Sequence, residues 1–163
     1  MTKNFLEINN VTFAASAQSK VNNVSLTIEN QGDIVCLLGP SGIGKTTILR
    51  TIAGLEKVQS GKITLKNKIL SSDNIHIEPE NRNISMGFQD NSLFPHYTVL
   101  ENIKFGADRN KKKKKGLNLN EINKLLHIEH IVNKYPHQIS SGEAQRASLA
   151  RSLLSNPDLL LLD

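Results

Sequence analysis

A glycine-rich octapeptide constrains this chain more than any other stretch. Residues 39–46 read Gly-Pro-Ser-Gly-Ile-Gly-Lys-Thr, which fits the pattern G-x-x-x-x-G-K-[ST]. The apolar residues 33–38 before it predict a short buried strand, and apolar residues recur at helical spacing over residues 48–53 after it. Gly54 then offers a C-cap. The stretch therefore predicts a strand, a glycine loop and a helix.

Such a loop is suited to binding phosphate. Glycines let consecutive backbone N–H groups turn into one concavity, and the helix that follows points its positive dipole end at the anion. In this chemistry Lys45 reaches the β- and γ-phosphates, and the Thr46 hydroxyl is a Mg²⁺ ligand. A turn with a chance Lys-Thr pair seldom lies between a strand and a helix, so the motif predicts a P-loop nucleotide site. Its residues are Gly39, Pro40, Ser41, Gly42, Ile43, Gly44, Lys45, Thr46 and Thr47.

The composition suits one soluble globular domain. The chain has 163 residues, of which 38% are hydrophobic and 21% charged. This length is enough for the chain to bury a hydrophobic core. No apolar run reaches membrane-spanning length, and the N-terminus lacks the apolar centre of a signal peptide. The single cysteine, Cys36, excludes an internal disulfide. Because Cys36 lies in the expected buried strand, we expect it to be structural.

The net charge of +5 raises the question of a nucleic-acid partner. Residues 111–115 are all lysine, and such a run is typical of a solvated flexible segment. Aromatic residues make up only 4% of the chain, which disfavours a base-stacking platform. We therefore expect no nucleic-acid partner. A net positive charge is also typical of a protein that lies beside an anionic membrane face.

Elsewhere in the chain, on both sides of the glycine loop, alternating or apolar stretches predict additional strands at residues 6–13, 21–28, 63–65 and 84–88. The polar residues 66–82 are expected to form turns. Residues 159–162 are four leucines closed by Asp163, which predicts a buried parallel strand whose carboxyl end reaches a ligand-binding edge.

Capping signals mark three helices. Thr98 with Glu101, and Ser140 with Glu143, have the spacing of capping boxes. Asn120 is expected to cap a helix that carries Ile122. Together the elements predict an α/β fold with an early, partly antiparallel region and a mostly helical insert over roughly residues 90–155.

Four motifs in this order resemble the ATP-binding subunit of an ABC transporter. They are the loop at 39–46, Gln89 with the following Leu-Phe-Pro-His, the helix start at Ser140, and the strand that ends at Asp163. The resemblance runs from about residue 6 to residue 163. It implies a P-loop NTPase of the ABC-ATPase fold, with an antiparallel β subdomain, a helical subdomain near residues 90–155, and an incomplete C-terminus.

The resemblance also implies roles for individual residues. ATP and Mg²⁺ are the expected cofactors, and Lys45 and Gln89 are the expected catalytic residues. Gln89 meets Mg²⁺ or the attacking water, and Asp163 holds Mg²⁺ through water, with Thr46 as a further metal ligand. Phe13 sits where the family stacks an aromatic ring on adenine, and an ordinary core position is the open alternative.

Residues Ser140, Ser141, Gly142 and Glu143 resemble the signature motif, which contacts ATP on the opposite subunit. The usual motif has glycine and glutamine where this chain has Ser141 and Glu143. The capping box survives this change. Ser141, however, adds a side chain where the family brings backbone close to phosphate.

The family also has a glutamate directly after Asp163, a D-loop and a switch histidine. All five histidines of this chain precede Asp163, so none of them is that histidine. The sequence is thus expected to be a fragment of a longer chain, and a defective gene product is the open alternative. As given, it is expected to hydrolyse ATP at no useful rate and to be prone to aggregation.

The expected function is energising solute import at the cytoplasmic face of the inner membrane, as a peripheral subunit. The implied partners are a second copy, membrane permease subunits and, indirectly, a solute-binding protein. Residues 80–84, 89–99 (with 93–96 among them) and 135–137 look like those of ferric-ion importers, so ferric iron is the expected solute. Importers of polyamine, sulfate, molybdate, thiamine and sugar share much of this pattern. A soluble ABC ATPase acting on nucleic acid or the ribosome is the rival, with only the lysine run in its favour.

Overall fold

A computed structural model describes the chain except for residues 1–3, 15–19, 88–92 and 108–115. The chain forms two compact units, Met1–Arg82 and Asn83–Asp163. Each unit has its own sheet and its own helices, and each is described by itself.

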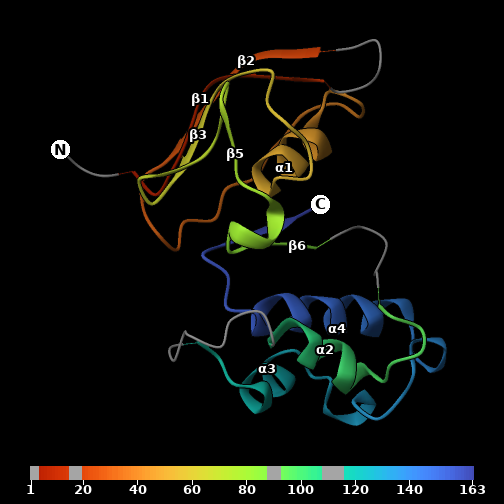
Figure 1. The fold of residues 1–163 in the computed structure, drawn as a ribbon. Coiled ribbons are helices and arrows are strands. Elements are labelled where there is room, and N and C mark those ends of the chain that lie inside the picture. The colour runs from red at the N-terminus through yellow and green to blue at the C-terminus, as the bar shows by residue number, and fades with distance from the viewer. Residues whose placement is uncertain (1–3, 15–19, 88–92, 108–115) are drawn as a thin grey trace. The chain divides into compact units, whose positions relative to one another are not determined.

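The first unit contains a five-stranded antiparallel sheet in the order β2-β1-β3-β4-β5 (Figure 1). Its strands are β1 (Leu6–Ala14), β2 (Lys20–Ile28), β3 (Ser60–Leu65), β4 (Lys68–Ser72) and β5 (Ile75–His76). Leu6, Ile8, Val11 and Phe13 of β1 are all buried, although a strict two-residue period would turn Val11 outward. A register shift between Ile8 and Val11 restores the inward direction. The strands expected at 6–13, 21–28 and 63–65 are confirmed.

The expectation that residues 66–82 form only turns is wrong. This segment contains β4, β5 and a short 3₁₀ helix, Pro79–Asn81. Lys66 and Asn67 both have positive φ, 48° and 65°, and Leu65 pairs with Lys68 across them. Two consecutive residues of positive φ are the signature of a tight hairpin turn, and Asn tolerates this region better than most residues. The short turn reverses the chain direction, so that the polar segment after it pairs with β3 as strand β4.

The strand expected at residues 33–38 is also absent. This stretch has no regular secondary structure, Ile34 and Leu38 are 94% and 92% exposed, and Cys36 is exposed rather than buried. A fully apolar strand is stabilised by hydrogen-bonded neighbours on both sides. Among the described residues of this unit, the sheet consists of β2, β1, β3, β4 and β5 only. Residues 33–38 therefore have no hydrogen-bonded strand neighbour within it.

Helix α1 (Lys45–Ala53) packs against this sheet (Figure 1), with Ile48 and Ile52 buried. It ends at Gly54, whose φ of 89° confirms the expected C-cap. A Cβ at position 54 would lie 2.3 Å from Nε of Arg82, so glycine is required there for space as well as for conformation.

Arg82 is a buried cation that ties the end of α1 to the hairpin formed by β4 and β5, and the residue is 2% exposed. Its Nη1 donates to the carbonyls of Thr51 and Ile52 at 3.1 and 3.0 Å. Its Nε donates to the Ile77 carbonyl at 2.6 Å, and its Nη2 donates to Ser71 Oγ at 2.8 Å. Burial lowers the pKa of Arg82 to about 10, so the guanidinium stays charged at neutral pH. A cation at the carboxyl end of α1 also complements the helix dipole.

Among its described residues, the second unit has two parallel strands and three α-helices (Figure 1). They are β6 (Ile84–Gly87), β7 (Leu159–Leu162), α2 (Val99–Ala107), α3 (Leu119–Leu125) and α4 (Ser141–Leu154). Two 3₁₀ turns, Glu129–Ile131 and Pro136–Gln138, precede α4. Within the described residues, no helix combines the length and apolar character needed to cross a bilayer. The division of residues 90–155 into a separate subdomain stays a prediction.

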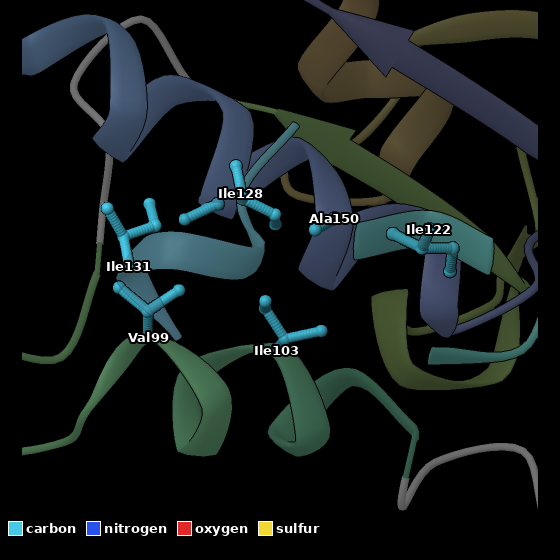
Figure 2. Packing of buried hydrophobic residues seen from close by; sticks show 7 residues of the cluster. Val99, Ile103, Ile122, Ile128, Ile131 and Ala150 are labelled. Carbon is cyan, nitrogen blue, oxygen red and sulfur yellow. The ribbon is translucent and has the colours of Figure 1, made fainter. Parts of the chain in front are cut away.

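A small apolar core holds the helices together (Figure 2). Its members are fully buried and come from α2, α3, α4 and the 3₁₀ turn Glu129–Ile131 with the residue before it: Val99, Ile103, Ile122, Ile128, Ile131, Ala147 and Ala150. The alanines on α4 allow α2 to approach closely. At Gly106 of α2 a Cβ would lie 2.2 Å from the Arg151 carbonyl, which shows how tight this packing is.

The helix starts follow the capping signals with one exception. The boxes at Thr98–Glu101 and Ser140–Glu143 are confirmed. Helix α3, however, is capped by Asn118 instead of Asn120. Only Asn118 has a glutamate three residues later, Glu121, and the pair exchanges both hydrogen bonds of a capping box.

The strand at residues 159–162 is parallel to β6, as expected, but it is buried only in part. Leu161 is 7% exposed, whereas Leu162 is 61% exposed. Within the described residues of this unit, β7 has a hydrogen-bonded neighbour, β6, on one side only. An apolar parallel strand is fully buried only when it has a neighbouring strand on each side and other elements pack on both faces of the sheet.

The buried network at Arg82 gives a stability prediction. Arg82→Met should lower the free energy of unfolding by about 2–4 kcal/mol, because Ile52 and Ser71 lose the guanidinium as a hydrogen-bond donor and the Thr51 carbonyl keeps only the Gly54 N–H. Arg50→Met is the matched control. Arg50 pairs with Glu56 at 3.2 Å with both side chains substantially exposed, so its loss should change stability by no more than about 0.5 kcal/mol. Urea unfolding measures both, and equal losses would contradict the role given to Arg82.

Candidate nucleotide-binding site

The glycine loop adopts a conformation that side-chain-bearing residues avoid. Gly42 has φ 81° and Gly44 has φ 102°, both in the left-handed region. A Cβ on Gly42 would meet nothing within 4 Å, so this position is restricted by backbone conformation rather than by space. The two glycines let the chain turn tightly into the first residue of α1.

The start of α1 is left open to an external anion. Its N-cap residue is Gly44, which supplies no side-chain hydrogen bond, and the first turn of the helix carries no acidic residue. The first backbone N–H groups of a helix have no intrahelical partner. By contrast, α4 starts with its own glutamate bonded into the cap. The N-terminus of α1 thus has the features of a phosphate site.

Lys45 places its charge over the loop. Its Nζ donates to the carbonyls of Gly39 at 2.8 Å and Pro40 at 2.9 Å. An ammonium group has three N–H donors, and these two contacts use two of them. The loop carbonyls therefore hold the cation beside the open helix start, where it can donate to a bound phosphate.

These features fit MgATP. Thr46 is the second residue of α1, and its hydroxyl can serve as a Mg²⁺ ligand. In nucleotide sites Mg²⁺ usually takes one or two protein oxygens and completes its shell with phosphates and water. Among the residues that the structure describes, no group of three or more His, Cys, Asp or Glu side chains is placed to hold a metal ion by itself. Thr46 and Asp163 belong to different units, so a joint metal site stays a prediction.

The other expected site residues have different outcomes. Asp163 follows β7, as expected, and its N–H donates to the Gly87 carbonyl at 3.2 Å. Gln89 lies outside the described residues. Phe13 is 1% exposed and belongs to the core, which is one of its two alternatives. Stacking on adenine would require an exposed ring face.

The signature segment forms the first turn of α4. The backbone N–H and the hydroxyl of Ser140 each donate to Glu143 Oε2 at 2.8 Å. The N–H of Glu143 in turn donates to Ser140 Oγ at 3.3 Å. His130 Nε2 donates to the other carboxylate oxygen of Glu143, Oε1, at 2.9 Å. These bonds, first from the Ser140 N–H, then its hydroxyl and then His130, lower the pKa of Glu143 to about 2.

Sequence reasoning missed two of these residues, Arg82 and His130. His130 lies 13 positions from its partner Glu143. Arg82 lies 31 and 30 positions from Thr51 and Ile52, whose carbonyls it binds. No local spacing rule connects residues so far apart. The buried, charged character of Arg82 is set by the tertiary fold alone.

Comparisons with known proteins agree with the site. The profile of the family described as "ABC transporter" matches residues 21–163. The putrescine transport ATP-binding protein PotG of Escherichia coli is 45% identical over 160 residues, covering 97% of this chain and 41% of that protein. The spermidine/putrescine import ATP-binding protein PotA of Nitrosospira multiformis is 43% identical over 163 residues, covering 97% and 43%. The chain therefore spans about two fifths of the length of these curated relatives.

Solved structures show the same fold. A dimeric ATP-binding cassette in a post-hydrolysis state, bound to ADP and Pi, superposes with a TM-score of 0.77 at 29% identity, covering 97% of this chain and 73% of that one. An ATP-binding subunit of an ABC transporter superposes with a TM-score of 0.81 at 21% identity, covering 98% and 65%, and supports the fold alone.

The loop geometry predicts the effect of removing its cation. Lys45→Ala should weaken MgATP binding at least tenfold, a loss of about 1.4 kcal/mol or more, because phosphate charge then lacks its nearest counter-charge. Lys62→Ala removes the same charge from an exposed position on β3 and should leave the affinity unchanged within about twofold. Isothermal titration calorimetry on the full-length protein measures both, and equal affinities for Lys45→Ala and the parent would contradict the assignment.

The low pKa of Glu143 predicts a pH-dependent contribution to stability. Since the folded-state pKa is about 2 against an ordinary value of 4.5, the carboxylate stabilises the fold above pH 4.5 and loses this effect as the pH falls toward 2. The parent should therefore exceed Glu143→Gln in unfolding free energy by more at pH 6 than at pH 3. Urea titrations at both pH values measure the difference. A difference that stays constant or grows at pH 3 would be incompatible with this carboxylate network.

Proposed function

Because the chain belongs to the ABC transporter family, we propose that it forms the ATP-binding part of an importer ATPase whose solute is a polyamine. The observation that carries the ATPase proposal is the glycine loop, which opens onto an uncapped helix start with Lys45 held beside it. The names of the relatives support a polyamine as the solute, since PotG is described as a putrescine transport protein and PotA as a spermidine/putrescine import protein.

The residues of this chain have separate tasks in that function. Backbone N–H groups from Gly42 to Thr46 bind phosphate oxygens, and Lys45 adds a charged donor. MgATP, when bound, supplies the phosphoryl group whose transfer to water releases the energy for transport. The protein contributes chiefly position and electrostatic stabilisation, because the loop is already formed around the place that the phosphates would take.

The expectation of ferric iron as the solute is not supported. It rested on short segments such as residues 93–96 and 135–137, which many importer ATPases share. The relatives named above match 97% of this chain, and their names refer to putrescine or spermidine transport. A polyamine was among the alternative solutes. We therefore replace iron with a polyamine in the proposal.

The proposed partners are a second copy of the ATPase, membrane permease subunits and, indirectly, a solute-binding protein. The ADP-bound neighbour is described as dimeric, which supports the pairing of two copies. The proposed location is the cytoplasmic face of the inner membrane, where the subunit binds peripherally. The rival acting on nucleic acid or the ribosome has no support from the described residues, because the lysine run lies outside them.

Uptake measurements test the solute. Deleting the gene that encodes this chain should abolish most uptake of radiolabelled putrescine or spermidine, whereas uptake of radiolabelled iron should continue. Re-expression of the parent gene should restore uptake, and re-expression of the Lys45→Ala variant should not, because the importer then lacks its nucleotide site. Unchanged polyamine uptake together with the loss of another solute would reassign the importer.

A further inference from the structure

A hollow in the first unit lies between the segment that follows α1 and the hairpin of β4 and β5. It has a volume of about 230 Å³ and is lined by Lys57, Val58 and residues 72–76. None of these residues belongs to the glycine loop at residues 39–47. Pockets for drug-sized ligands have volumes of about 300–1,000 Å³, so this hollow suits a smaller molecule.

The hairpin turn brings polar groups to the hollow that the fold does not use. Ser72 pairs with Ile75 between β4 and β5, so Asp73 and Asn74 form a two-residue loop. Asp and Asn side chains in turns commonly bond to the backbone of neighbouring residues. In the part of the chain that the structure describes, the side chains of Ser72, Asp73 and Asn74 make no such bond. A hydroxyl, a carboxylate and an amide are therefore available to a ligand.

Two opposite charges line the hollow without neutralising each other. Lys57 carries an ammonium group and Asp73 a carboxylate, and among the described residues neither side chain forms an ion pair. A cation and an anion held apart on the wall of one small hollow are complementary to a ligand that carries both charges. Lys57 would repel a ligand with positive charges only, and Asp73 would repel one with negative charges only.

The rest of the wall is partly aliphatic and partly held by the Arg82 network. Val58 and Ile75 contribute aliphatic surface, and the side chain of His76 is 17% exposed. Nδ1 of His76 lies 3.3 Å from Nη2 of Arg82. Because a guanidinium can only donate, Nδ1 is the acceptor, and the hydrogen of the neutral ring is then on Nε2. A wall that is already held in place reduces the entropy that a ligand must lose on binding.

We infer that this hollow binds a small zwitterion, an amino acid whose ammonium and carboxylate groups are separated by a short aliphatic chain. The carboxylate of Asp73 accepts from the ligand ammonium, and the ammonium of Lys57 donates to the ligand carboxylate. The aliphatic chain of the ligand lies against Val58 and Ile75. This site goes beyond the proposed function and does not depend on it, because it shares no residue with the glycine loop.

Three probes with the same number of carbon atoms separate the effect of charge from that of size. γ-Aminobutyrate carries both charges, butyrate carries only the carboxylate, and putrescine carries only ammonium groups. In ¹⁵N-labelled full-length protein, γ-aminobutyrate should cause saturable shifts of the amide signals of residues 57, 58 and 72–76, with a Kd of about 1 mM. Butyrate and putrescine should bind at least about tenfold more weakly. No saturable shift at these residues, or equal binding of the three probes, would overturn the inference.

Single substitutions test the two charges. Lys57 and Asp73 are both exposed, so Lys57→Gln and Asp73→Asn should fold normally, and each should weaken binding of γ-aminobutyrate at least about fivefold. Lys62→Gln is the matched control, because it removes the same charge from an exposed position on β3 outside the hollow. Its affinity should stay within about twofold of the parent. Parent-like binding by Lys57→Gln and Asp73→Asn, or an equal loss in Lys62→Gln, would overturn the site.

A parallel titration with MgATP distinguishes this failure from failure of the proposed function. The Lys57→Gln and Asp73→Asn variants should bind MgATP as the parent does, which also shows that they are folded. A parent that binds MgATP but not γ-aminobutyrate overturns only the zwitterion site. A parent that binds γ-aminobutyrate but not MgATP supports the zwitterion site and overturns the proposed function.

Discussion

The first unit depends on how the carboxyl end of α1 is satisfied. The last carbonyls of a helix lack intrahelical donors, and burying them unbonded would be costly. Arg82 reaches Thr51 and Ile52 across the hairpin and binds both carbonyls, while Ser71 and Ile77 hold the same guanidinium. The buried cation thereby links the carboxyl end of α1 to β4 and to the residue after β5. The phosphate loop lies at the opposite end of the same helix.

The starts of α1 and α4 are built in opposite ways. Helix α1 starts with a glycine and carries no acidic residue in its first turn, so no side chain of the N-cap residue bonds to its start. Helix α4 starts with a serine and a glutamate that bond to each other, and a histidine binds the glutamate. The first start is ready for a nucleotide phosphate. The second already has its own carboxylate bonded into the cap.

The sequence predicted what short spacings control. The glycine loop, the C-cap at Gly54 and the capping box at Ser140 depend on residues within a few positions of one another, and the structure shows all three. It did not predict what distant contacts decide. The apolar residues 33–38 lack strand neighbours in their unit, and a tight turn at Asn67 makes a strand from a polar stretch. Arg82 and His130 were missed because both act on residues more than ten positions away.

The central claim, that the glycine loop receives the phosphates of a nucleotide, can be tested by nuclear magnetic resonance. In ¹⁵N-labelled full-length protein titrated with MgATP, the account predicts that the largest saturable shifts of amide signals fall on Gly42, Gly44, Lys45 and Thr46. Inorganic pyrophosphate should shift the same signals, because the phosphates make these contacts. Saturable binding of MgATP with its main shifts elsewhere, and none on the loop, would contradict the account.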